Sequence, residues 1–298
     1  MGKEFGSEIK YATEGASLLW PIQRIREDGR ELVDDRVVLE EPLEIVVNGQ
    51  SVAVLMRMPG QEKELAAGFC VSEGYVRRAG DILLIHHCGS GYGAPGDEES
   101  GDVSGSRNRV EMHVVAEGFS PPDQASAIRL IRSGCGAAEV AAISEALPLV
   151  PQGLRVPSAM LLALGRVMRE LQNVHPQVGG THSAALFLPT GEAVILAEDI
   201  GRHNAVDKVL GHCLLRGIPL SDKVLVTSGR ASYEMALKAV RVGVPIVATI
   251  SAPTSLAVQL AEDRGLTLIG YLRGGRMNVY THPRRVVTEG QGNGNTGD

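Results

Sequence analysis

The sequence predicts an α/β protein made of a small, mostly antiparallel α+β domain followed by a larger α/β domain. Near the start, Asn48-Gly49 separates two β-rich runs, which is the strongest short signal for a hairpin. Later in the chain, apolar runs alternate with helical runs that end in glycine, as in a largely parallel sheet flanked by helices. We expect a flexible arm at 1–30, the two domains at 31–120 and 121–285, and a flexible tail at 286–298.

Composition excludes several classes of protein. The 298 residues are 44% hydrophobic and 21% charged, as in ordinary globular proteins. A formal net charge of -6 argues against nonspecific binding of nucleic acid. No run reaches the roughly 18 apolar residues of a membrane span, and the first residues lack the apolar run of a secretion signal. Four cysteines without close pairs suit a reducing compartment, so we expect a cytoplasmic protein that contacts neither nucleic acid nor membrane.

The first domain contains short β-rich runs and one amphipathic run. A helix is expected over 61–74, where Leu65, Phe69 and Val71 lie in or near one apolar stripe. The glycine-rich stretch 89–106 has the composition of a flexible surface loop. Strands are expected at 36–39, 43–47, 52–56, 82–86 and 109–116.

In the second domain, expected strands and helices alternate regularly. Gly217, Gly243 and Gly265 each follow a helical run and are well placed for the left-handed conformation that ends a helix. A hairpin is expected across Thr190-Gly191. The expected helices are 123–132, 137–147, 157–173, 204–216, 231–242 and 255–264, and the expected strands are 183–188, 193–197, 223–226, 244–250 and 266–271.

Four segments are expected at the carboxyl ends of the strands, where ligands of open α/β sheets bind. They are 198–204, 227–230, 251–254 and 271–276. Their small residues allow close approach to the backbone, and helix N-termini favour anions. Arg202, Arg230, Arg273 and Arg276 are suited to bidentate phosphate contacts. The segments together indicate a phosphorylated, nucleotide-containing ligand, although any one of them alone would be an ordinary cap or turn.

Cys135 is the outstanding candidate nucleophile. Gly134 and Gly136 leave it a mobile backbone, and it lies at the start of a predicted helix with Arg129 and Arg132 upstream, which favours the thiolate. The alternative is a small buried apolar residue. Of the other cysteines, we expect Cys70 and Cys213 in the core and Cys88 beside a loop, where it would compete with Cys135 for reactivity.

Two histidines and two aspartates lie close to these segments in the sequence. His182 and His203 are expected in loops that face the crevice, where they would act as acid or base or orient a ligand. Asp199 and Asp207 are expected to form salt bridges or helix caps.

Six runs resemble the FdhD family, and they follow one another in the family's order between residues 32 and 285. Motifs of this length are highly specific. The runs are 41–49, 179–185, 198–208, 227–235, 251–257 and 274–282.

The resemblance implies a fold, an activity and partners. The larger domain would have a cytidine deaminase-like three-layer α/β/α fold. The protein would be a dimeric sulfur carrier that accepts persulfide sulfur from a cysteine desulfurase. It would pass that sulfur to molybdenum bis(molybdopterin guanine dinucleotide), the cofactor of formate dehydrogenase. The cofactor would be a bound substrate, with no metal ligated by the protein itself.

By position, Cys135 looks like the family's persulfide-forming cysteine. The cofactor-binding residues would be Tyr271, Leu272, Arg273, Gly274, Gly275 and Arg276, together with Ser228 and Arg230 from the reading of the strand ends. One departure is that Ala138 stands where the family loop has a second cysteine, which removes any internal resolving thiol. A cofactor-binding chaperone without sulfur chemistry is therefore an alternative. A zinc deaminase is disfavoured, because the His-x-Glu and Pro-Cys-x-x-Cys segments it requires are both absent from the sequence.

Overall fold

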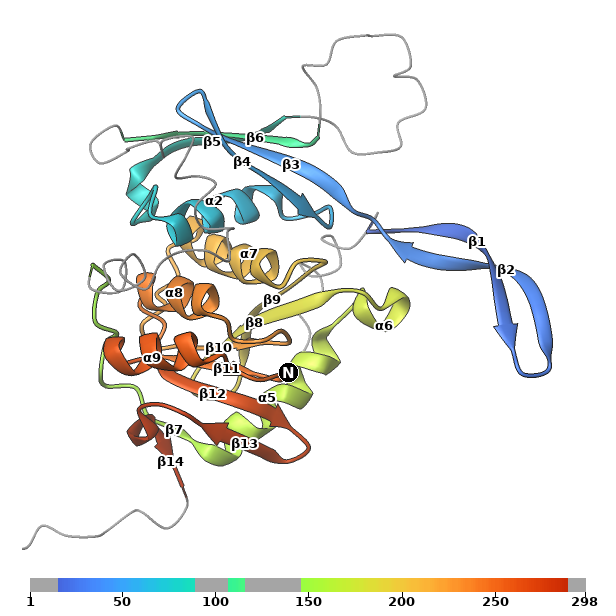
Figure 1. Ribbon diagram of the computed structural model, residues 1–298. Helices are drawn as coiled ribbons and strands as arrows, with labels where there is room; N and C mark the ends of the chain where they lie inside the picture. Colours follow the sequence, from blue (N-terminus) through green and yellow to red (C-terminus); the bar gives the residue numbers. More distant parts are fainter. Residues whose placement is uncertain (1–15, 89–106, 116–145, 289–298) are drawn as a thin grey trace, which may run out of the picture.

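The computed structural model describes residues 16–88, 107–115 and 146–288, and it shows a mixed α/β architecture (Figure 1). A four-stranded sheet and a six-stranded sheet lie on opposite sides of a layer of helices. This confirms the predicted α/β class. No helix in these three ranges is long and apolar enough to cross a membrane.

The small sheet confirms the predicted hairpin and its mostly antiparallel character. Asn48 and Gly49 both have positive φ angles, 48° and 78°, as a two-residue hairpin turn requires. The strand order is β4-β3-β6-β5, and only the β3–β6 pairing is parallel. Helix α2 covers one face. The bounds are β3 Glu41–Val47, β4 Gln50–Arg57, α2 Glu62–Glu73, β5 Ile82–Cys88 and β6 Arg109–Val114, with a 3-10 turn at Ala79–Asp81.

The large sheet has the order β13-β12-β11-β10-β8-β9. Strands β10, β11 and β12 are parallel, but the other three pairings are antiparallel. The prediction of a largely parallel sheet was therefore wrong, because the β8–β9 hairpin lies on one side of the parallel centre and the antiparallel strand β13 lies on the other. The bounds are β8 His182–Phe187, β9 Ala193–Asp199, β10 Val224–Thr227, β11 Ile246–Thr249, β12 Thr267–Arg273 and β13 Arg276–Val279.

Helices cover both faces of the large sheet. Val224 and Val226 of β10 join the hydrophobic cluster of α5, whereas Leu225 joins the cluster of α7, α8 and α9, as strand alternation requires. Glycines 217, 243 and 265 have φ angles of 63°, 76° and 78°, which confirms the predicted helix ends. The helices are α5 Ser158–Leu171, α6 His175–Val178, α7 Arg202–Leu215, α8 Tyr233–Arg241 and α9 Ser255–Arg264.

Helices α2 and α7 join the two sheets through one continuous hydrophobic core. Their backbones approach closely at Gly68 and Gly211. A methyl group on Gly68 would overlap the backbone carbonyl of Asp207, and one on Gly211 would overlap that of Glu64. Only glycine allows two helices this close together, so both positions are fixed by packing.

Two expectations about the chain ends differ from the structure. Residues expected in the irregular arm form a projecting hairpin of β1 (Ser17–Arg26) and β2 (Gly29–Val38). Its two turn residues, Glu27 and Asp28, are followed by Gly29, and the prediction did not use this Asp-Gly step. The expected tail begins with a short strand, β14 (Val286–Val287), which pairs with β7 (Val156–Pro157). The expected loop 89–106 and helix 123–132 lie outside the described residues, as does nearly all of the expected helix 137–147.

We predict that Gly68→Ala destabilises the protein by about 3 kcal/mol, because the added methyl group must push α2 and α7 apart. Urea unfolding monitored by circular dichroism measures the change. Gly80→Ala is the control, since a methyl group at Gly80 meets no atom within 4 Å. Equal stability of the two variants would contradict the close packing.

Candidate functional site

One edge of the large sheet gathers the segments predicted to bind the ligand. The parallel strands β10, β11 and β12 all end there. Because β8 runs antiparallel to β10, its first residue, His182, lies at the same edge, and its register partner Asp199 ends β9 beside it. The four segments predicted from sequence therefore converge, although the sheet is mixed.

Hydrogen bonds tie three of these segments together. Ala231 N donates to Ala252 O at 3.2 Å, and Tyr271 N donates to Ser251 O at 2.9 Å. The Thr249 hydroxyl donates to the carbonyl of Gly229. The segment after β11 is thus held between the segments after β10 and β12, which makes the edge a connected surface.

Ser228, a predicted ligand residue, lies beside His182. Its Oγ accepts a hydrogen bond from Ser183 N at 2.9 Å and lies 3.2 Å from His182 Nδ1. Burial, followed by the positive charge of Arg202, lowers the pKa of His182. The ring is therefore neutral at pH 7, and its Nδ1 can accept the Ser228 hydroxyl proton. This contact orients His182 at the edge, where the sequence placed it.

Arg202, at the start of α7, is a cation close to both histidines. Its side chain packs on Gly229, where a Cβ atom would lie 2.8 Å from Arg202 Cδ. Its charge acts on His182 and His203. Arg230 follows in the same segment as Gly229 and is exposed. The two arginines, beside two neutral rings, give this part of the edge a positive character that suits an anionic ligand.

His203 lies between Glu234 and Ser232. Its Nδ1 is 3.1 Å from Glu234 Oε2, and its Nε2 is 3.5 Å from Ser232 Oγ. Burial, with Lys238 and Arg202 acting in the same direction, lowers the pKa of His203 to about 4. The neutral ring donates from Nδ1, because a carboxylate only accepts, and this leaves an unprotonated Nε2. His203 Nε2 is therefore available to accept a hydrogen bond.

The segment Tyr271–Arg276 forms the turn between β12 and β13. Tyr271 has a φ of 55°, which is uncommon for a residue with a side chain, and Gly274 and Gly275 have φ angles of 59° and 71°. The Arg273 guanidinium lies 5.7 Å from the centre of the Tyr271 ring. Arg273 and Arg276 are paired in register and exposed.

Leu272 differs from the other residues predicted in this segment. Its side chain is buried in the hydrophobic cluster under α5. The side chain therefore cannot reach a ligand at the edge, because residue 272 is directed into the core. Only its backbone remains available for such a contact.

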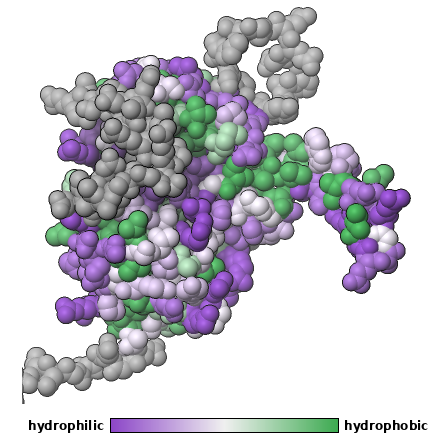
Figure 2. Space-filling view, viewed as in Figure 1, coloured by the Kyte–Doolittle hydropathy of each residue, from purple (hydrophilic) through white to green (hydrophobic). Residues whose placement is uncertain are grey.

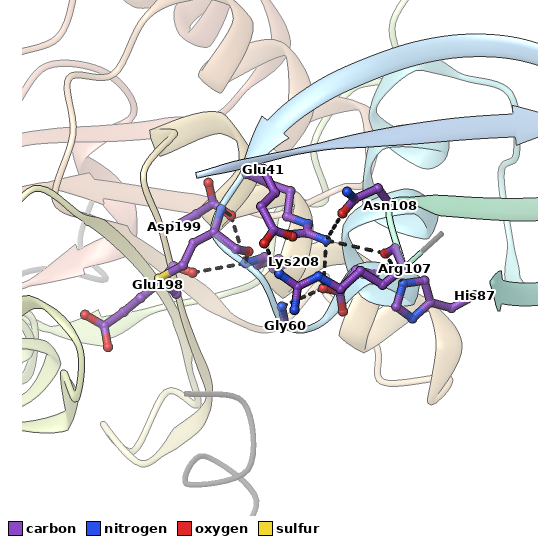
Figure 3. A network of polar contacts seen from close by, with 11 residues as sticks. Glu41, Gly60, His87, Arg107, Asn108, Glu198, Asp199 and Lys208 are labelled. Carbon is purple, nitrogen blue, oxygen red and sulfur yellow. Dashed lines mark hydrogen bonds and ion pairs between the residues drawn. The ribbon is translucent and has the colours of Figure 1, made fainter. Parts of the chain in front are cut away.

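A buried polar network lies behind the site and joins the two sheets (Figure 3). Asp199 pairs with Lys208 at 2.8 Å and accepts from Met58 N at 3.3 Å. Lys208 Nζ also donates to Met58 O at 3.0 Å. Arg57, fully buried, pairs with Glu41 and Glu62. Buried charges require such partners, so the network fixes the end of β9 against the loop that follows β4.

Asp207 forms a second buried ion pair on the far side of α7. Both of its carboxylate oxygens lie 2.8 Å from Lys238 Nζ, and one accepts from the Ser72 hydroxyl at 2.7 Å. Burial raises the pKa of Asp207, and Lys238 opposes that rise. The prediction that Asp199 and Asp207 form salt bridges is confirmed.

The cysteines divide as expected where the structure describes them. Cys70 and Cys213 are buried, and burial raises the pKa of both thiols, that of Cys213 to about 12. Neither thiol is suited to act as a nucleophile. Cys88 is partly exposed at the end of β5. Cys135, the predicted nucleophile, lies outside the described residues.

Sequence reasoning assigned no role to Ser232, Glu234 or Glu198, although all three lie in runs that it singled out. Glu198 accepts hydrogen bonds from three successive backbone N–H groups, those of Asn173, Val174 and His175, and so anchors the start of α6. Ser232 precedes α8, a position that capping preference could have indicated. No sequence signal connects Glu234 to His203, because the two residues are brought together only by the packing of α7 against α8. Within the described ranges, no group of three or more His, Cys, Asp or Glu residues is arranged to hold a metal ion.

The fold and the site define an α/β protein whose sheet edge combines arginines with neutral histidines. A profile of the FdhD/NarQ family matches residues 38–287. "Sulfur carrier protein FdhD" of Mycobacterium tuberculosis is 41% identical over 261 residues, which cover 85% of this chain and 92% of the relative. Its namesake in Sulfolobus acidocaldarius is 36% identical over 266 residues, covering 89% and 96%. This chain belongs to the FdhD/NarQ family.

A solved structure supports the same family membership. The crystal structure of a protein described as a formate dehydrogenase accessory protein, from Desulfotalea psychrophila, superposes with a TM-score of 0.73. That protein is 29% identical, and the match covers 91% of this chain and all of the other. The resemblance drawn from the six sequence runs is therefore confirmed.

We predict that His203 stays neutral, with its proton on Nδ1, when the pH is lowered from 7 to 5. The native pKa of about 4 lies below the roughly 6.5 of an unfolded histidine, so the unfolded chain binds more protons as the pH falls. The stability that His203 contributes is complete above pH 6.5 and is lost as the pH falls toward 4. Nitrogen NMR of labelled histidines reads the protonation state directly.

His203→Gln provides the matched comparison in stability. Its free energy of unfolding should fall less steeply than that of the wild type between pH 6.5 and 4, because the variant has no imidazole to protonate on unfolding. If the free energies of unfolding of the two proteins change equally with pH, or if the ring is protonated at pH 6, His203 is not held neutral.

Proposed function

We propose that this protein is a sulfur carrier that supports the activity of formate dehydrogenase. Its membership of the FdhD/NarQ family supports this function, together with relatives named sulfur carrier protein that cover most of the chain. The observation that carries the proposal is the match along residues 38–287, which includes every segment at the sheet edge. The described site then supplies a physical reason for binding a large anionic substrate.

The substrate we propose is molybdenum bis(molybdopterin guanine dinucleotide), bound at the sheet edge by its phosphate-bearing part. Arg230, Arg273 and Arg276 are exposed there and can make bidentate contacts to phosphate. Ser228 and the backbone of the Gly274-Gly275 turn offer hydrogen bonds at close range. Tyr271 presents an aromatic ring under the Arg273 guanidinium, and such a pair can stack on a base.

Cys135 is the proposed sulfur-carrying residue, with a cysteine desulfurase as the donor. The Cys135 thiolate would attack the outer sulfur of the donor's persulfide, and the donor cysteine would leave as a thiolate. The acceptor would then attack the outer sulfur on Cys135, and the Cys135 thiolate would leave. Neither step needs a second thiol. Transfer is thus compatible with Ala138 at the place of the family's second cysteine.

The proposal also includes three expectations about the fold, the association and the location of the protein. The likeness of the larger domain to cytidine deaminase agrees with helices on both faces of its sheet. Association as a homodimer and a cytoplasmic location follow from the family resemblance and from the sparse cysteines.

The second candidate is a chaperone that binds the cofactor without carrying sulfur. The replacement of the second loop cysteine by Ala138 favours it. The two functions share the cofactor site and differ only in the need for the Cys135 thiol.

We predict that incubation with a cysteine desulfurase and cysteine adds one sulfur atom to the tryptic peptide containing Cys135. Mass spectrometry of the intact peptide measures the added sulfur. Cys135→Ala should abolish both the added sulfur and the maturation of formate dehydrogenase, whereas Cys88→Ala should preserve both. If Cys135→Ala still supports maturation, the chaperone is the correct function.

We also predict that guanosine diphosphate binds at the sheet edge. Arg230→Ala and Arg276→Ala should each weaken binding about tenfold, because each removes one charge-assisted contact worth roughly 1.5 kcal/mol. Calorimetric titration measures the change. The control is Arg216→Ala at the opposite end of α7, where Arg216 pairs on the surface with Glu64 at 3.2 Å. Equal losses in all three variants would place the nucleotide elsewhere.

A further inference from the structure

Glu234 is an acid at the sheet edge where the arginines of the site gather. Two other acids in the converging segments, Glu198 and Asp199, are buried and hold backbone N–H groups and Lys208. The Glu234 side chain, in contrast, is 37% exposed. An exposed carboxylate beside a phosphate site repels the phosphate, so its presence at this edge needs a chemical reason.

The carboxylate of Glu234 is held by one of its two oxygens. Oε2 lies 3.1 Å from His203 Nδ1, which donates to it. Glu234 also lies in the first turn of α8, where the helix N-terminus favours a negative charge. Oε1 has no hydrogen-bond or ion-pair partner among the described residues. The side chain is therefore fixed in direction and still able to accept hydrogen bonds.

The surface at this edge is polar. The carboxyl ends of β10, β11 and β12 lie on the side of the body below the β1–β2 hairpin (Figure 1). Figure 2 shows mostly hydrophilic and intermediate residues on this side, whereas hydrophobic residues gather at the base of the hairpin. Arg230, four residues before Glu234, is exposed. A cation and an acid this close in one segment suit a ligand that carries both a phosphate and hydrogen-bond donors.

Guanine is the base that a carboxylate recognises best. Its Watson–Crick edge presents two adjacent donors, N1–H and the 2-amino group, and an ionised carboxylate only accepts. Adenine presents an acceptor between its donor and C2, so a carboxylate repels it. We propose that Glu234 recognises the guanine base of the bound nucleotide and so determines base specificity.

This inference rests on the proposed function, in which the ligand is a guanine dinucleotide. Oε1 of Glu234 accepts from one guanine donor. Oε2 accepts from the other with its second lone pair, beside the bond from His203. His203 is a positioning residue, because it acts on the base only through Glu234. The acid faces the uncharged base, and Arg230 faces the phosphate, so both charges have a use in one site.

Base analogues test the proposal on the full chain without a substitution. The wild type should bind guanosine diphosphate about tenfold more tightly than inosine diphosphate, which lacks the 2-amino group. It should bind adenosine diphosphate about 100-fold more weakly, because each charge-assisted hydrogen bond that is lost costs about tenfold. Calorimetric titration measures the dissociation constants. Equal binding of guanosine and inosine diphosphate would overturn the proposal.

Glu234→Gln should exchange the preferred base. The amide presents one donor and one acceptor, which match xanthine, because xanthine has a carbonyl where guanine has its 2-amino group. Binding of guanosine diphosphate should weaken at least about tenfold, and xanthosine diphosphate should become the preferred ligand. A merely structural role of Glu234 would weaken both nucleotides alike.

Glu262→Gln is the matched control. Glu262 is also an exposed glutamate beside a histidine, with Oε2 3.7 Å from His282 Nε2. It lies in the last turns of α9, whereas the sheet edge is at the start of that helix. This variant should keep the wild-type preference for guanosine diphosphate. Circular dichroism should show that both variants remain folded.

Two kinds of failure are distinguishable. If the wild type binds no guanosine diphosphate, the cofactor site of the proposed function is wrong, and the role of Glu234 is wrong with it. If the wild type binds guanosine diphosphate and Arg230→Ala weakens that binding, but Glu234→Gln still prefers guanosine to xanthosine diphosphate, the cofactor site stands and only the role of Glu234 is wrong.

Discussion

The close contact between α2 and α7 determines where the site lies. Helix α7 begins at the sheet edge with Arg202 and His203, so the position of this helix sets the position of both side chains. Gly68 and Gly211 bring the helix backbones together, and the buried pair of Asp207 with Lys238 attaches α7 to α8. Because a buried ion pair is stable only with its partners in place, α7 has little freedom to shift. The same α7–α8 contact brings Glu234 to His203.

The charge of the site depends on the buried hydrogen bonds and ion pairs of the acids next to it. Two of the acids near the edge are committed elsewhere: Glu198 to three backbone N–H groups, and Asp199 to Lys208 and Met58. Their negative charges are thus compensated within the protein. The arginines at the edge lie beside neutral histidines, so their positive charge is available for the phosphate contacts that we propose. Because the buried carboxylates are paired within the protein, the exposed arginines keep their positive charge at the edge.

The sequence predicted the strands and helices well, because most of them follow from local signals. Asn48-Gly49 specified the small hairpin, and Gly217, Gly243 and Gly265 ended their helices as expected. The direction of the strands was harder to predict, because a short apolar run such as β8 has the same sequence pattern beside a parallel or an antiparallel neighbour. The arm β1–β2 was missed because its polar and apolar residues do not alternate toward a core. The convergence of the site segments was predicted, since it depends on topology, but the contact of Glu234 with His203 depends on packing between helices and has no local signal.

The links between the two sheets also constrain how the protein can be made. Met58 lies 150 positions before its hydrogen-bond partner Lys208, and Met56 lies 148 positions before its partner Asn204. A ribosome therefore releases β3, β4 and α2 long before α7 exists to cover them. The apolar side of α2 therefore stays exposed to solvent until α7 has been synthesised. Contacts between residues this distant in the chain also form slowly. The sheet edge with its converging segments can form only after nearly the whole polypeptide has left the exit tunnel, which makes this protein a candidate client for chaperones that bind nascent chains.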